Sequence, residues 1–81
     1  MAYTYIIYSA QLDKYYIGST RVELSERIQK HNTNHKGFTG RANDWSLKYS
    51  EYFDMYELAG KREREIKGWK SRKLIEKLCS N

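Results

Sequence analysis

Alternating apolar and polar residues predict three strands along the chain. Residues 3–9 (YTYIIYS) are rich in aromatic and β-branched side chains, which favour extended backbone. Residues 14–19 (KYYIGS) have a similar composition, and the short polar connector before them predicts that the two segments form a hairpin. Residues 45–53 (WSLKYSEYF) alternate apolar with polar positions and indicate a third strand, with Trp45 expected to be buried beneath the preceding loop.

A first helix is predicted between the second and third strands. Thr20, followed three positions later by Glu23, is a capping-box signature, which places the helix start at Arg21 and its end near residue 32 or 34. Spacings of three and four residues put several side chains on one face of this helix, namely Leu24, Ile28 and His31, with Arg27 beside them. The glycine-containing segment 34–44 is expected to be a loop.

Two more helices are predicted after the third strand. Residues 55–68 have one inward-facing stripe, and Gly68 is expected to end the helix. The stripe consists of Met55, Leu58, Ala59, Arg62 and Ile66. Ser71 is the expected N-cap of a short last helix that ends near Leu78. The predicted order is β-β-α-β-α-α, a small α/β (α+β) fold with a mainly antiparallel three-stranded sheet flanked by helices, and residues 1–81 are expected to form a single domain.

The net charge of +5 lies in one part of the chain. Residues 1–60 hold seven basic and seven acidic residues, whereas residues 61–77 hold eight basic and three acidic residues. Positive charge concentrated in this way attracts polyanions, nucleic acid above all, because phosphate binding releases counterions. A solvated helix face with a basic tail would give the same pattern, so charge alone leaves both interpretations open.

Other features of the composition indicate the cellular compartment in which the protein is expected to act. The single cysteine, Cys79, can form no internal disulfide, which fits a reducing environment. No apolar run is long enough to span a bilayer, and the first residues lack the basic and apolar regions of a secretion signal. We therefore expect a cytoplasmic protein that does not associate with membranes.

The tyrosines of the predicted hairpin carry a family resemblance. The pattern YTY … YYIG … RIQKH … E resembles the GIY-YIG nuclease family over nearly the whole chain. Tyr16, Ile17 and Gly18 reproduce the second half of the family motif, and Tyr5 matches the last tyrosine of its first half. Tyr3 stands where the family has glycine, a departure associated with its small stand-alone members. The chain is similar to the GIY-YIG domain of the excision-repair nuclease subunit.

The same resemblance extends to the helices. The segment SERIQKHN resembles the first helix of the family, with Arg27 and His31 at its four-residue spacing. The segment GKREREIKGWKSRK resembles the helix that presents the metal-binding glutamate, which is matched to Glu63, or to Glu65 if the alignment shifts by two residues. Ser19 occupies a position where some members have lysine, and Arg21 is then a substitute source of charge.

The resemblance implies an endonuclease that hydrolyses phosphodiester bonds in DNA with a single divalent metal, Mg²⁺ or Mn²⁺, and that is structure-specific in repair or recombination. The implied catalytic residues are Tyr5, Tyr16, Arg27, His31 and Glu63. Tyr16 would be the general base with support from Tyr5, because a phenol with a pKa of ~10 needs nearby positive charge to ionise. Arg27 and His31 would steady phosphate or water, and Glu63 would bind the metal. One carboxylate suffices for Mg²⁺, which keeps most of its waters.

Nucleic-acid binding is expected to use basic side chains that contact phosphates, with little sequence information. The candidates are Arg21, Lys36, Arg41, Lys61, Arg62, Lys67, Lys70, Arg72 and Lys73. A homodimer or a partner protein would then supply specificity. Phe38 and Trp45 are aromatic side chains near basic ones, which can stack on unpaired bases.

Alternatives remain open for the whole chain and for single residues. The fold could be a nucleic-acid-binding adaptor with weak or lost catalysis, or a basic structural protein whose tyrosines only pack. His31 and His35 have the spacing of a zinc pair, although no second cysteine or acid lies nearby. Arg27 could pair with Glu23. Glu63 could balance a neighbouring cation of its helix, namely Lys61, Arg62 or Lys67.

Overall fold

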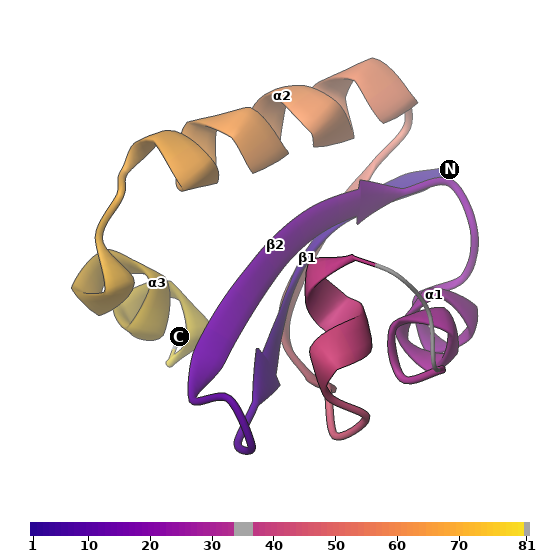
Figure 1. The fold of residues 1–81 in the computed structure, drawn as a ribbon. Coiled ribbons are helices and arrows are strands. Elements are labelled where there is room, and N and C mark those ends of the chain that lie inside the picture. The colour runs from indigo at the N-terminus through magenta and orange to yellow at the C-terminus, as the bar shows by residue number, and fades with distance from the viewer. Residues whose placement is uncertain (34–36, 81) are drawn as a thin grey trace.

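The computed structural model of the protein describes residues 1–33 and 37–80. The order β-β-α-β-α-α is confirmed, with a short 3-10 helix, η1, between the first α-helix and the third strand (Figure 1). The elements are β1 (Ala2–Ser9), β2 (Lys14–Thr20), α1 (Leu24–His31), η1 (Phe38–Arg41), β3 (Ser46–Phe53), α2 (Tyr56–Gly68) and α3 (Arg72–Cys79). His35, a candidate zinc ligand, and Lys36, a candidate phosphate contact, lie outside the described residues.

The three strands form one antiparallel sheet in the order β2-β1-β3. The predicted hairpin is confirmed, and its register places Tyr5 opposite Gly18 and Ile7 opposite Tyr16. β1 is the central strand, so β2 and β3 each have one edge without a neighbouring strand in the described part of the chain. No described strand pairs with the outer edge of β2, which we call the open edge of β2.

Each face of the sheet is covered by a different set of helices. Figure 1 shows α2 and α3 on one side of the strands and α1 with η1 on the other. Because side chains alternate along a strand, Ile6 packs with Ile66 of α2, whereas the next residue, Ile7, packs with Trp45 beside α1 and η1. Trp45 is 3% exposed, which confirms its predicted burial. The sheet thus separates two apolar clusters.

The capping-box prediction at Thr20 is wrong. Thr20 is the last residue of β2, paired with Tyr3, and its Oγ1 accepts a hydrogen bond from the Val22 amide at 3.1 Å. Since hairpin pairing holds Thr20 extended, α1 begins only at Leu24, and no side chain caps its first turn. The predicted face of α1 is nevertheless present, because His31 is buried and Ile28 packs against the cluster around Trp45.

The predicted apolar stripe of α2 is only partly correct. Ala59 and Ile66 are fully buried, but Met55 and Leu58 are 53% and 47% exposed. Met55 lies at the N-cap of α2 in extended conformation, so its side chain does not follow the helical stripe. The alternation predicted for residues 45–53 is also interrupted, because β3 has an irregularity opposite Ile6 and Ile7.

The end of the chain follows the prediction. α2 ends at Gly68, and Ser71 caps α3 by accepting a hydrogen bond from the Leu74 amide at 3.2 Å. Between the two helices, Lys70 has a φ of 50°, in the left-handed region that favours glycine. Among the described residues, no helix has the length and apolar content needed to cross a membrane.

Lys70→Gly is expected to raise the free energy of unfolding by up to roughly 1 kcal/mol, because glycine adopts the left-handed backbone without the steric penalty of a side chain. Urea denaturation measures the change. Lys73→Gly is the matched control, since Lys73 is an exposed lysine inside α3 and its replacement should lower stability by about 1 kcal/mol. Equal effects of the two substitutions would contradict the prediction.

Candidate active site

The ring of Tyr5 lies directly across Gly18. Tyr5 is fully buried, and a Cβ atom added to Gly18 would lie 2.5 Å from the Tyr5 hydroxyl oxygen and 2.7 Å from its Cζ. Real Cβ atoms do not approach other atoms this closely, so the position accepts only glycine while Tyr5 keeps its place. The glycine of the YIG motif is therefore explained by the tyrosine on the neighbouring strand.

The Tyr5 hydroxyl joins β1 to α1 and η1. It lies 2.6 Å from His31 Nε2, and it accepts a weaker hydrogen bond from Arg27 Nε at 3.4 Å. The other nitrogen of His31, Nδ1, lies 2.9 Å from Thr39 Oγ1. Because Arg27 donates to Tyr5, the Tyr5 proton is free to point at His31 Nε2. This arrangement favours the histidine tautomer that carries its proton on Nδ1 and donates it to Thr39.

Burial keeps Tyr5 in its neutral form. Burial raises the pKa of Tyr5 above its ordinary value of 10, and the hydrogen bond and charge of Arg27 lower it by less. The same hydrogen bond raises the pKa of Arg27. Tyr5 therefore holds its proton near neutral pH and is suited to orient Arg27 and His31, not to remove a proton from water.

Tyr16 is in a different environment from Tyr5. Its side chain is half-buried and lines a hollow of about 460 Å³, whose walls also include Arg27, Lys30 and His31. The Tyr16 ring lies 5.2 Å from that of His31 and is stacked 6.2 Å from Phe38. No other described residue forms a hydrogen bond with the Tyr16 hydroxyl. This phenol is available to a molecule in the hollow.

Glu63 reaches the site from the other face of the sheet. Side-chain alternation along β2 turns Ser19 towards α2, and the Ser19 hydroxyl donates a hydrogen bond of 2.6 Å to Glu63 Oε1. Lys67 Nζ lies 2.6 Å from Glu63 Oε2 and 5.7 Å from the centre of the Tyr16 ring. Lys67 thus links Glu63 to Tyr16 around the open edge of β2. The alternative in which Glu63 balances Lys67 is borne out by this ion pair.

The donor atoms at Glu63 fit one hydrated divalent cation. Of the two glutamates that the sequence resemblance offers as the metal ligand, Glu63 is half-buried beside Ser19, whereas Glu65 is exposed and paired with Arg62. Within the described residues, no group of three or more histidines, cysteines or acidic side chains gathers at one point. Mg²⁺ can bind through a single carboxylate if waters and substrate phosphates complete its shell, whereas a closed protein site for zinc would need more ligands.

Besides Lys67, two of the candidate phosphate contacts are already held in ion pairs. Arg62 lies 3.1 Å from Glu51 and its guanidinium stacks on Trp69. Arg72 pairs with Asp13 at 2.6 Å and with Glu76 at 3.1 Å. Both arginines therefore tie elements together.

The remaining described candidates have more accessible charges. Arg21 lies over the Tyr56 ring and Arg41 over the Phe38 ring, at 4.4 Å and 5.7 Å. The others are exposed lysines without an ion pair to another described residue, namely Lys61, Lys70 and Lys73.

Sequence reasoning did not find two residues of the site. Thr39 holds His31 from η1, but it lies in a predicted loop, and nothing in the pattern indicates this contact. Lys30 lines the hollow beside Tyr16. Its position three residues after Arg27 on a predicted helix was a usable signal, because residues at this spacing share a face.

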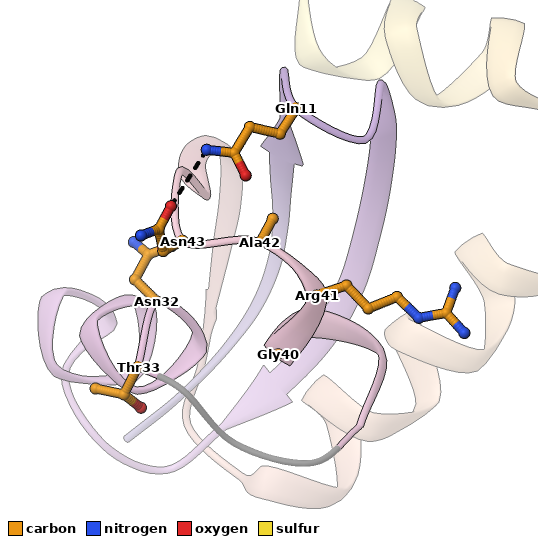
Figure 2. A pocket seen from close by; sticks show the side chains of 7 residues that line it. All are labelled: Gln11, Asn32, Thr33, Gly40, Arg41, Ala42 and Asn43. Carbon is orange, nitrogen blue, oxygen red and sulfur yellow. Dashed lines mark hydrogen bonds between the residues drawn. The ribbon is translucent and has the colours of Figure 1, made fainter.

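A separate hollow of about 310 Å³ lies on the other side of η1 and contains none of the candidate catalytic residues. Figure 2 shows Gln11 and Asn43 across it, joined by a hydrogen bond of 3.2 Å, with the side chain of Arg41 extending away from them. Apart from Arg41, its walls are amides, small side chains and backbone, so the Tyr16 hollow is the better candidate for an active site.

Gly18→Ala is expected to displace Tyr5 and to lower the free energy of unfolding by roughly 1–3 kcal/mol, because the added methyl group overlaps the Tyr5 ring. Gly60→Ala is the control. A Cβ at Gly60 has 3.5 Å to its nearest neighbour, and alanine favours the helix by about 1 kcal/mol. Urea denaturation should thus show opposite signs. A Gly18→Ala protein as stable as wild type would show that Tyr5 is not confined there.

Tyr5→Phe is expected to change the dependence of stability on pH. Since the folded pKa of Tyr5 exceeds its unfolded value of about 10, its contribution is fully present below that pH and is lost as the pH rises through the folded pKa. Urea denaturation at a series of pH values should show a smaller alkaline loss for Tyr5→Phe than for wild type. The other tyrosines are present in both proteins, so identical slopes would contradict the assignment to Tyr5.

The chain matches a known protein family. Residues 1–76 match the GIY-YIG catalytic domain, which is nearly the whole chain. No curated protein and no solved structure matches it significantly. Tyr16, Gly18 and Glu63 all lie within the matched residues. The chain therefore belongs to the GIY-YIG family, which is a family of nucleases.

Proposed function

We propose that this protein is a metal-dependent endonuclease that hydrolyses phosphodiester bonds in DNA and acts on particular DNA structures in repair or recombination. The observation that carries the proposal is the meeting of two groups at the open edge of β2. Tyr16 faces a hollow with Arg27 and Lys30 on its walls, and Glu63 lies around the same edge, linked to the Tyr16 ring through Lys67.

Tyr16 is the proposed general base, which takes a proton from the attacking water. A general base must reach the water that it deprotonates, and Tyr16 lines the hollow beside Arg27, with Lys67 near its ring. Arg27 is also suited to bind the phosphate, since its guanidinium can stabilise the negative charge that develops on the phosphate oxygens.

Tyr5 and His31 are proposed positioning residues. His31 is 6% exposed and both of its ring nitrogens have hydrogen-bond partners, so its direct use on substrate would require it to leave Tyr5 or Thr39. Tyr5 accepts from Arg27, and His31 packs against Tyr16. Together they fix the two groups that face the hollow.

Glu63 is the proposed ligand of Mg²⁺ or Mn²⁺. A divalent cation bound there would supply Lewis-acid stabilisation of the phosphate charge. The Ser19 hydroxyl orients Oε1 of the Glu63 carboxylate. Oε2 is paired with the ammonium of Lys67, which must move away before a cation can bind there. The Lys67 side chain is 46% exposed, so it can turn towards solvent or towards a phosphate.

The setting of this activity belongs to the same proposal. Residues 1–81 act as a single domain in the cytoplasm, and a homodimer or a partner protein supplies specificity that phosphate contacts lack. The accessible cations are suited to hold DNA at low salt, and this affinity should fall steeply as salt is added.

Nicking of supercoiled plasmid at low salt with Mg²⁺ or Mn²⁺ tests the catalytic roles. Tyr16→Phe and Glu63→Gln are expected to lower the rate by about 10²–10⁴-fold, because each removes a group used in the chemical step. The matched controls are Tyr15→Phe, the neighbouring phenol on the other face of β2, and Glu65→Gln, the neighbouring exposed acid on α2. Both should cut like wild type.

The outcomes distinguish the proposal from its alternatives. Loss of cutting in Glu65→Gln but not in Glu63→Gln would move the metal ligand by two residues. A protein that binds DNA in a salt-dependent way but never cuts it would be an adaptor, an alternative favoured by the ammonium of Lys67 on Glu63. Equal cutting by all variants would refute the assigned roles.

A further inference from the structure

We propose that the edge of β2 carries a nucleotide track, and that an unpaired base of the substrate stacks on Phe38 beside the candidate active site. This inference rests on the proposed function. It narrows the substrate class from DNA in general to nucleic acid with unpaired nucleotides next to the cleaved bond. Three observations carry it: a line of hollows, an exposed ring between two of them, and accessible cations along their walls.

Three hollows follow one another along β2. The first, of about 400 Å³, lies at Lys14 and extends to the start of α3. The second, of about 460 Å³, contains Tyr16, and the third, of about 330 Å³, begins at Ser19. Neighbouring hollows share walls, since Phe38 lines the first and second and Arg27 lines the second and third. The three hollows therefore adjoin one another in a row, which we call the depression, with the candidate general base in its middle hollow.

Phe38 is an accessible aromatic ring where the first and second hollows meet, and Tyr56, 37% exposed, lines the third hollow beneath Arg21. Phe38 is 39% exposed, whereas its neighbour Trp45 is 3% exposed and donates its ring N–H to the Thr39 carbonyl. The Phe38 ring is stacked against that of Tyr16 at 19°, and it lines both the catalytic hollow and the first hollow. Gly37, with a φ of 115°, fixes the turn that leads into this ring.

The walls of the depression carry positive charge that the protein itself does not neutralise. Lys14, Lys30 and Lys70 line the hollows and have no ion pair to another described residue. Lys70 occupies a left-handed backbone position that favours glycine, which is consistent with a role for its side chain. Arg41 lies over the Phe38 ring, so a base that stacks there would take the place of its guanidinium, and Arg41 could then contact the phosphate of the same nucleotide.

This combination of ring and charge selects unpaired nucleotides. In a duplex, the faces of each base are covered by its neighbours, so only a base that has left the helix can stack on Phe38. A continuous duplex can reach the same lysines through its phosphates but gains nothing from the ring. Phe38 should therefore affect the binding of single strands, whereas the lysines should affect the binding of both forms.

Fluorescence anisotropy in EDTA measures binding without cleavage, with a labelled oligothymidylate and a duplex of the same length as probes. Phe38→Leu is expected to weaken oligothymidylate binding by roughly 5- to 100-fold and to leave duplex binding nearly unchanged. Phe38→Trp should retain the single-strand affinity. Tyr52→Leu is the matched control, since Tyr52 is 54% exposed but lies on β3, the opposite edge of the sheet.

Two results would overturn the inference: unchanged oligothymidylate binding by Phe38→Leu, or equal weakening for single strand and duplex. Thermal unfolding of Phe38→Leu, together with retained binding by Phe38→Trp, separates loss of the ring from loss of the fold. Single-strand binding through Phe38 in a protein that never cuts with Mg²⁺ or Mn²⁺ supports this inference and refutes the nuclease. If Phe38→Leu cuts DNA and binds oligothymidylate as well as wild type does, this inference is refuted and the nuclease assignment is supported.

Discussion

The contact between the Tyr5 ring and Gly18 is the constraint on which the candidate site depends. A side chain at position 18 would occupy the space of the Tyr5 hydroxyl, and that hydroxyl is hydrogen-bonded to both Arg27 and His31 of α1. The ring is fully buried, so its position is held by packing on all sides. One missing Cβ atom on β2 thus fixes the direction of two side chains on α1.

The site also depends on its position at the edge of the sheet. Alternation along β2 sends Tyr16 towards α1 and Ser19 towards α2, so the residues that α1 and α2 contribute lie on opposite faces. Within the sheet, backbone would separate these two groups. Only around an edge strand can a group such as Lys67 approach both Glu63 and the ring of Tyr16. The sheet order, with β2 outermost, is therefore as important to the chemistry as the residues are.

Local signals predicted much of the fold, because they report interactions within a few residues. The tyrosine- and isoleucine-rich strands and the Ser71 cap are of this kind. Thr20 shows the limit, since hairpin pairing with Tyr3 overrides a capping signature that the local sequence satisfies. The hydrogen bonds from Ser19 to Glu63 and between His31 and Thr39 could not be predicted, because they depend on how α2 and η1 pack on the sheet.

The open edge of β2 also bears on how the protein behaves among copies of itself. An unpaired strand edge is a template for pairing with another chain, and proteins commonly protect such edges with charged residues. Lys14 begins β2 and Arg21 follows its end, so positive charge flanks the exposed backbone at both ends. These charges repel a second copy of the chain and attract phosphate at the same strand. Solubility and affinity for polyanions are thus coupled in this fold, and a sequence change that weakens one of them also weakens the other.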